Sequence, residues 1–172
     1  MIVPFAAGGG TDLFARNVCE SLRESLGQPC IVENKAGAGT GIGSSYVSES
    51  APDGYTLLLT TSSFSILPAI NGNIGYDGVR AFTPIARIGE TPNVLVVRVD
   101  SQFKNAEQLI KAAKSAPGRL NYGSSGDGTT THMSAELMNS MADLKMEHIP
   151  YRGAVPLITD LIGGQLDVGF SS

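Results

Sequence analysis

The chain has 172 residues, of which 42% are hydrophobic and 16% charged, so it is long enough to bury a core and lies between the usual sizes of one domain and two. A formal net charge of −4, with its 12 lysines and arginines scattered, excludes a basic surface for nucleic acid or for an anionic membrane. No run approaches the roughly 18 apolar residues that a membrane-spanning helix needs.

The first predicted elements are a strand at Ile2-Val3 and an amphipathic helix over 13–26, joined by the glycine-rich turn from Pro4 to Asp12. Its three consecutive glycines allow positive φ angles and leave amide N–H groups uncovered. Thr11 or Asp12 is expected to cap the helix, with the Asp12 carboxylate stabilising its N-terminal dipole. Because the turn contains no lysine or arginine, it predicts a backbone site for an anion, although an ordinary strand-to-helix turn fits the same residues.

Residues 29–33 are predicted to form a second strand, which gives a parallel βαβ unit whose first loop lies at the carboxyl edge of the sheet. The glycine-rich segment 34–43 does not match the dinucleotide-binding fingerprint at any of its glycines, and no Gly-Lys pair indicates a phosphate-binding loop. The simpler interpretation is a turn that leads into a helix over 41–49.

A further strand is predicted over 56–60, followed by the hydroxyl cluster Thr61-Ser62-Ser63. These hydroxyls either face the same sheet edge as the first turn or cap the next helix. Residues 68–84 have the composition of a loop, and two more strands are predicted at 85–88 and 93–99.

The pattern of strand, small-residue turn and helix then repeats. The predicted elements are a helix over 105–114, a strand over 120–122, a Gly/Ser/Thr turn, a helix over 131–141, a strand over 146–149, a loop over 150–153, a helix over 155–162 and a strand over 166–170. Two turns of the same design predict an α/β protein of two lobes, residues 1–96 and 97–172, around a ligand cleft.

The cysteines and histidines carry weaker signals. Cys19 and Cys30 allow one disulfide but do not require it, because both fall at positions predicted to be buried, where free cysteine behaves as a small hydrophobe. His132 and His148 have no cysteine or carboxylate partner at ligand spacing, so the sequence predicts no metal site. Met1 precedes strand-like residues with no apolar leader, so the N-terminus is expected to be that of a mature chain.

Eight motifs, in order along the chain, resemble the TctC/Bug family, the extracytoplasmic solute receptors of tripartite tricarboxylate transporters. The motifs occupy Ile2–Asp12, Leu26–Gln28, Val32–Gly39, Pro52–Leu58, Phe82–Ala86, Gly123–Thr129 with His132, His148–Gly153 and Asp160–Asp167.

The resemblance implies a type II periplasmic-binding-protein fold and a periplasmic receptor that captures a small carboxylate and delivers it to membrane transporter subunits, with no cofactor and no catalysis. The ligand-binding residues that we expect are Phe5, Ala6, Ala7, Gly8, Gly9, Asp12, Thr61, Ser62, Ser63, Ser124, Ser125, Gly126, His132, Tyr151 and Gly153. The chain departs from the family at its two cysteines, where apolar residues are usual, and it lacks the C-terminal part that returns to the first lobe.

Two other function classes compete with that of a receptor. An esterase with a Gly-x-Ser-x-Gly elbow is disfavoured, because Asp127 stands where Ser125 would need a glycine and Tyr122 where Ser124 would need one. An interaction module that binds a peptide carboxylate remains open. Since the return to the first lobe is absent, we also expect this chain to form a homo-oligomer through uncovered strand edges.

Overall fold

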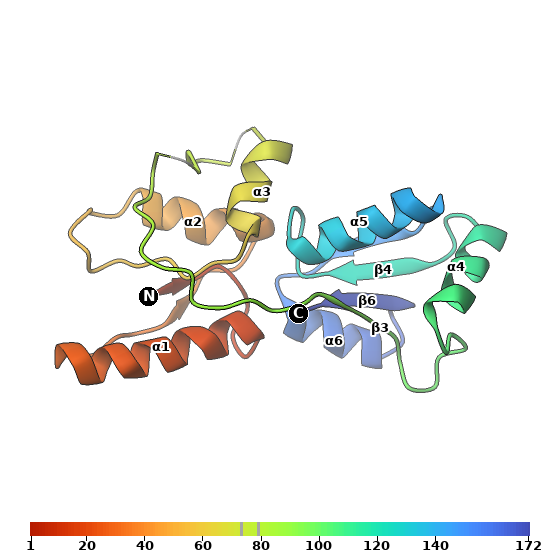
Figure 1. Ribbon diagram of the computed structural model, residues 1–172, viewed down its shortest axis with the longest axis horizontal. Helices are drawn as coiled ribbons and strands as arrows, with labels where there is room; N and C mark the ends of the chain where they lie inside the picture. The colour runs from red at the N-terminus through yellow and green to blue at the C-terminus, as the bar shows by residue number, and fades with distance from the viewer. Residues whose placement is uncertain (73, 79) are drawn as a thin grey trace. The chain divides into compact units, whose positions relative to one another are not determined.

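A computed structural model describes residues 1–72, 74–78 and 80–172. The chain divides into two compact units, Met1–Glu90 and Thr91–Ser172, each of which has its own sheet and helices (Figure 1). Among the described residues, no helix has the length and apolar character needed to cross a bilayer.

The sheet of the first unit is centred on β1 (Ile2–Val3). On one side β1 pairs in parallel with β2 (Glu33–Asn34), with Ile2 opposite Glu33. On the other side Ile2 forms a parallel bridge with Leu58, and its N–H donates to Leu57 O over 2.7 Å. The carboxyl ends of three parallel segments therefore meet at one edge, where the glycine-rich turn, Asn34 and the 61–63 hydroxyls follow.

The helices of this unit are α1 (Gly10–Leu26), α2 (Gly41–Ser48), which follows the short 3-10 turn η1 (Ala38–Thr40), and α3 (Ser63–Ile70). Helix α1 begins three residues before the predicted start, and its N-cap is Gly9, with no side-chain cap bond. The predicted cap by Thr11 or Asp12 is therefore wrong. The predicted stop is confirmed, since Gly27 ends the helix in the left-handed region at φ 65°.

Three other expectations for this unit change. The strand predicted over 29–33 is assigned only at Glu33–Asn34, although Ile31 O also accepts from the amino terminus of Met1 over 2.7 Å. The strand predicted over 85–88 is absent; Ile85 is 80% exposed, so this apolar run buries nothing. Helix α3 runs past Pro68 into the predicted loop 68–84, of which positions 73 and 79 lie outside the described residues.

The two cysteines form a disulfide, which the sequence had left open. Cys19 lies on the buried face of α1, and Cys30 lies just before β2. The bond therefore fastens the helix of the βαβ unit to the segment that leads back into its sheet, beside a small core of Val3, Phe5, Ala15 and Leu59.

The sheet of the second unit has the order β3-β6-β4-β5, formed by β3 (Val94–Val96), β4 (Asn121–Ser124), β5 (Glu147–Pro150) and β6 (Val168–Ser171). Strand β3 is antiparallel to β6, and the other pairs are parallel. The second unit thus includes β3, which the sequence analysis placed at the end of the first lobe.

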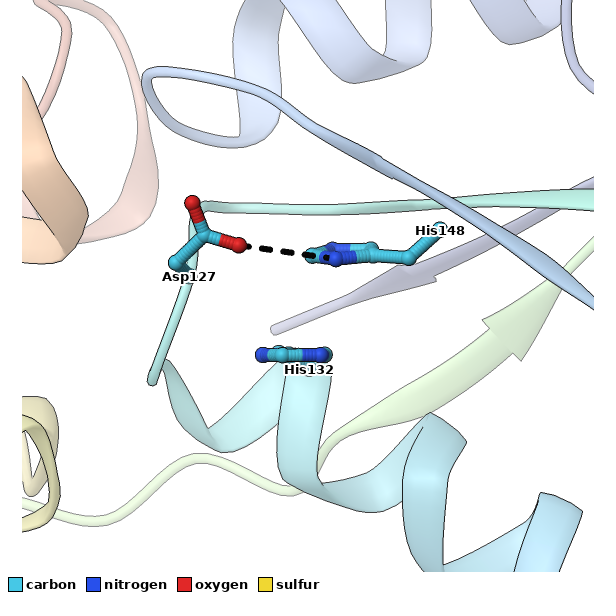
Figure 2. Close-up of side chains that lie close together, drawn as sticks. All are labelled: Asp127, His132 and His148. Atoms are coloured by element: carbon cyan, nitrogen blue, oxygen red, sulfur yellow. Dashed lines mark ion pairs between the residues drawn. The ribbon is translucent and has the colours of Figure 1, made fainter. Parts of the chain in front are cut away.

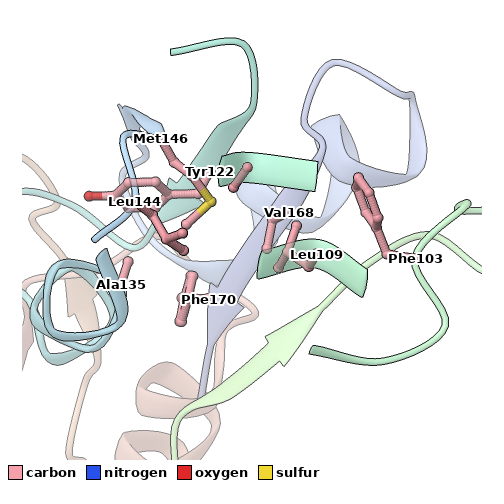
Figure 3. Packing of buried hydrophobic residues seen from close by; sticks show 9 residues of the cluster. Phe103, Leu109, Tyr122, Ala135, Leu144, Met146, Val168 and Phe170 are labelled. Atoms are coloured by element: carbon pink, nitrogen blue, oxygen red, sulfur yellow. The ribbon is translucent and has the colours of Figure 1, made fainter. Parts of the chain in front are cut away.

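Helices α4 (Ala106–Ser115), α5 (Thr130–Ala142) and α6 (Ala154–Ile162) cover this sheet. The core on one face joins the sheet to α4 and α5 through Tyr122, Val168, Leu109 and Ala135 (Figure 3). The opposite face lies against α6, where a Cβ on Gly123 would come within 3.1 Å of Leu157. Helices on both faces of a mostly parallel sheet confirm the predicted α/β class.

Candidate functional site

The glycine-rich turn of the first unit is held by one buried carboxylate. Asp12 is 1% exposed, and Gly8 N–H donates to its Oδ2 over 2.9 Å. Arg16 donates to both of its oxygens, and Asn34 Nδ2 donates to Oδ1 over 2.9 Å. These bonds, led by that from Arg16, lower the pKa of Asp12 to about 2. Asp12 was expected to contact the ligand, but its oxygens are occupied by the chain and shape the turn.

This turn presents backbone donors to solvent. Helix α1 makes its first bond from Leu13 N to Gly9 O, so the earlier amides have no intrahelical acceptor. Within the described residues, the amides of Ala7 and Gly10 have no hydrogen-bond partner, and both residues are exposed. Gly8 has φ 83°, a conformation that glycine adopts without strain. Unpaired backbone donors at the start of a helix are the feature on which the predicted anion site depends, and the anion site itself stays a prediction.

The positive side chains nearest to this turn are already paired. Arg16 is bound to Asp12, while Lys35 lies 2.7 Å from Glu33 and over the ring of Tyr46. An anion at the turn would therefore bind backbone N–H groups, because these lysine and arginine side chains already have ion-pair partners.

The other predicted residues of the first unit take different positions. The Phe5 side chain lies in the core, and its carbonyl accepts from Asn34. The hydroxyls of Thr61 and Ser63 bond each other at 2.8 Å, and Ser63 is fully buried. Ser62 is the N-cap of α3 without a side-chain cap bond, but Thr61 Oγ1 accepts from Ser63 N–H over 3.4 Å, so one of these hydroxyls contacts the start of that helix.

The second turn, between β4 and α5, resembles the first in sequence but differs in its hydrogen bonds. Ser125 N–H donates to Thr131 Oγ1, Gly126 N–H to Ser124 Oγ, and Gly128 N–H to His132 Nδ1. Thr129 caps α5 by accepting from His132 N–H. Most donors of this turn are therefore used within it, and it is not the open backbone site that the sequence predicted.

Two expected side chains near this edge differ in whether their hydroxyl groups are already hydrogen-bonded. Ser125 is half-buried, and its hydroxyl has no partner in the part of the chain that the structure describes. Tyr151 follows β5, where its N–H donates to Ser124 O, and burial followed by its hydrogen bond to Asp160 raises the pKa of Tyr151 to about 12. Gly153, at φ 134°, is buried as the N-cap of α6.

Below the second turn, aromatic rings form a stack. The His148 ring lies 4.9 Å from the Tyr122 ring on one side and 3.9 Å from the His132 ring on the other. Asp127 Oδ1 lies 3.5 Å from His148 Nδ1, and the His132 ring lies parallel to the His148 ring (Figure 2). Burial, and then the nearby His132, lower the pKa of His148, which favours its neutral form.

Ser124, His148 and Asp127 are arranged in space like the serine, histidine and aspartate of a hydrolase triad. His148 Nε2 lies 2.7 Å from Ser124 Oγ, and Asp127 lies at the other ring nitrogen. The access that a nucleophile needs is missing, because Ser124 is fully buried and its hydroxyl also contacts Gly126 N and O. The same contacts make Ser124 a structural link between the turn and the sheet.

Sequence reasoning missed three residues of these two sites: Asn34, Asp127 and His148. Each acts through a partner brought near by parallel strand pairing, for example Tyr122 opposite His148, so spacing along the chain carries no signal. The sequence shows no metal-ligand partner for either histidine. In the fold, however, Asp127, His132 and His148 lie close together.

The two α/β units, with strand-to-helix turns at the carboxyl ends of their strands, have the architecture of a ligand-binding protein. Residues 14–172 match the family described as Tripartite tricarboxylate transporter family receptor, TctC. The chain belongs to this family, which is a family of periplasmic solute-binding receptors and not an enzyme class.

Curated relatives agree with this assignment. A UPF0065 protein of Bordetella pertussis is 40% identical over 171 residues, which are 99% of this chain and 53% of that protein. BugT of the same organism is 37% identical over 166 residues, 95% of this chain and 51% of BugT. The chain thus spans about half the length of these relatives.

Solved structures confirm the predicted periplasmic-binding-protein fold. The periplasmic binding protein BugD superposes with a TM-score of 0.94 at 36% identity, over 99% of this chain and 57% of BugD. A Rhodopseudomonas palustris protein with adipate gives 0.91 at 32% identity, over 99% and 57% of the two chains. MatC from the same species, with bound malate, gives 0.87 at 32% identity, over 97% and 57%.

Proposed function

We propose that this chain is part of a periplasmic receptor that captures a small carboxylate for a tripartite tricarboxylate transporter, and that the carboxylate binds at the turn from Ala6 to Gly10. The observation that carries the proposal is the set of exposed, unpartnered amides in this turn, which the buried Asp12 holds in place. Charge-assisted hydrogen bonds of this kind contribute about 1.5–3 kcal/mol each.

Two further observations support a periplasmic carboxylate receptor. Adipate and malate, the ligands in two related structures, are both dicarboxylates. The disulfide between Cys19 and Cys30 fits an oxidising compartment, since such bonds are rare in the cytosol.

A thermal-shift panel tests the proposal. The protein is heated with mono-, di- and tricarboxylates, with uncharged amides of the same acids, and with short peptides that have a free C-terminus. We expect a dicarboxylate to raise the melting temperature while its diamide does not. Stabilisation by peptides alone would instead favour an interaction module, and no response to any carboxylate would contradict the proposal.

A further inference from the structure

Asp127, His132 and His148 of the second unit take no part in the proposed carboxylate site. They come from the turn after β4, the first turn of α5 and strand β5, and each offers a ligand atom within 4.8 Å of the others (Figure 2). We propose that these three side chains bind a divalent transition-metal ion of the Zn²⁺ type. The proposal does not depend on the carboxylate site, which lies in the other unit.

The strongest pair of donors is His148 Nδ1 and Asp127 Oδ1. Their separation of 3.5 Å is longer than an ordinary N–H···O hydrogen bond of about 2.7–3.2 Å. It is close to the distance of about 3.3 Å between two ligands of one tetrahedral ion whose metal–ligand bonds are about 2.0–2.1 Å. An ion shared by the two atoms therefore fits this gap better than a proton does.

The other nitrogen of His148 is held as metal-bound imidazoles usually are. With a metal at Nδ1, Nε2 carries the proton and donates to Ser124 Oγ, which lies 2.7 Å away. Ser124 can then direct its own proton to Gly126 O, at 3.2 Å, so every proton keeps a partner.

His132 completes the site by a rotation of its ring. The two imidazoles are stacked within 8° of parallel, so their in-plane lone pairs do not converge as they stand. Rotation about the Cβ–Cγ bond, a soft torsion in histidine, exchanges the hydrogen bond from Gly128 N–H for a bond to the metal. Asp127 lies on an exposed turn with its side chain 63% accessible, which leaves room for this adjustment and for a water ligand.

The donor set also selects the kind of ion. Two imidazoles and one carboxylate suit zinc, copper or nickel, whereas calcium and magnesium prefer oxygen ligands. The only two cysteines of the chain are joined in a disulfide, so no thiolate competes for the metal.

The test is a Zn²⁺ titration of the untagged protein by calorimetry, without reductant or chelating buffer, followed by Co²⁺ and its visible absorption bands. The sequence has only two histidines, so imidazole ligation can come only from this site. We expect saturable binding of one ion per chain and cobalt bands of a low-symmetry, nitrogen- and oxygen-ligated ion. Absence of saturable one-to-one binding would overturn the proposal.

Three substitutions remove one ligand each while keeping the neighbouring hydrogen bonds. His148→Gln keeps a donor to Ser124, His132→Asn keeps an acceptor for Gly128 N–H, and Asp127→Asn keeps the shape of an exposed side chain. Even loss of an outer-shell partner weakens metal sites by about 10–100-fold, so each variant should lose at least about tenfold in Zn²⁺ affinity.

Asp143→Asn serves as the matched control, because it removes an exposed carboxylate at the C-terminal end of α5 where asparagine tolerates the left-handed conformation. We expect its Zn²⁺ affinity to equal that of the unchanged protein. If His148→Gln fails to fold, the surface variant Asp127→Asn still decides. Affinity unchanged in a folded Asp127→Asn or His148→Gln variant would show that Zn²⁺ binds elsewhere and would refute the site.

Discussion

Asn34 Nδ2 donates to Asp12 Oδ1 over 2.9 Å, although 22 residues separate the two along the chain. The same amide donates to Phe5 O over 3.1 Å. Because Asn34 ends β2 and Asp12 lies in the first turn of α1, this contact joins both strands and the helix of the βαβ unit. The shape of the turn between β1 and α1 therefore depends on a buried polar pair as well as on its glycines.

Asp12→Asn should destabilise the protein by about 1–3 kcal/mol, because a neutral amide cannot replace the charge-assisted bonds from Gly8, Arg16 and Asn34. Urea unfolding at pH 7 measures the loss. The exposed Asp143→Asn serves as the control and should lie within about 0.5 kcal/mol of the unchanged protein. Equal free energies of unfolding for the unchanged protein, Asp12→Asn and Asp143→Asn would show that the hydrogen bonds of Asp12 contribute no net stability.

The same carboxylate predicts a pH dependence of stability. Its pKa is lowered from 3.8 to about 2 in the folded state, so its contribution is fully present above about pH 5 and is lost as the pH falls towards 2. The shift corresponds to about 2 kcal/mol in the free energy of unfolding. Urea unfolding between pH 7 and pH 2.5 should show a steeper loss for the unchanged protein than for Asp12→Asn, and parallel curves would contradict this assignment.

Lys35→Gln should leave carboxylate affinity within about threefold, because Lys35 is paired with Glu33 and the ligand is expected to bind peptide N–H groups. Gly8→Ala should weaken binding by about tenfold, since φ 83° strains an alanine in the turn that presents those groups. Calorimetric titration with the best ligand of the thermal-shift panel compares the two variants. A larger loss in Lys35→Gln than in Gly8→Ala would assign the carboxylate to the lysine.

The two adjacent serines of the second turn should differ in their effect on stability. Ser124→Ala removes a buried hydroxyl that contacts His148 and Gly126, so it should lower the free energy of unfolding by about 1–3 kcal/mol. The half-buried Ser125 hydroxyl bonds to no described residue, so Ser125→Ala should cost less than about 0.5 kcal/mol. Denaturant unfolding of both variants decides, and equal costs would mean that the hydrogen-bond network around Ser124 contributes little.

The triad-like order of Ser124, His148 and Asp127 should carry no hydrolysis, since Ser124 is fully buried. Turnover of an activated ester by the protein should equal that of Ser124→Ala and of a buffer blank containing free imidazole. If ester turnover depends on Ser124, the receptor assignment must be extended to an enzyme.

Reduction of the bond between Cys19 and Cys30 should destabilise the first unit. The chain-entropy model gives about 2–3 kcal/mol for a loop whose ends are 11 residues apart. Unfolding with and without a thiol reductant measures the effect, and a Cys19→Ala, Cys30→Ala double variant should match the reduced protein and not respond to the reductant.

The order of the main elements followed from the sequence because their signals are local. The apolar pair Ile2-Val3, the amphipathic run to Leu26 and the stop at Gly27 each depend on neighbouring residues, and the structure confirms all three. The exposed amides of the first turn also followed from local sequence, because consecutive glycines have no side chains to cover them. The turn contains no lysine or arginine, so the predicted anion site depends on these amides.

What the tertiary structure alone decided is which partners these residues meet. Both turns are rich in glycine, but the second is closed by Thr131, His132 and Ser124, whose positions depend on strand register and helix placement. The bridge from Asn34 to Asp12 and the meeting of Asp127 with His148 arise from parallel pairing between distant segments. Local composition determined where the two turns lie. Which turn keeps free backbone N–H groups was decided only by the fold, because parallel strands bring together residues that are far apart in the chain.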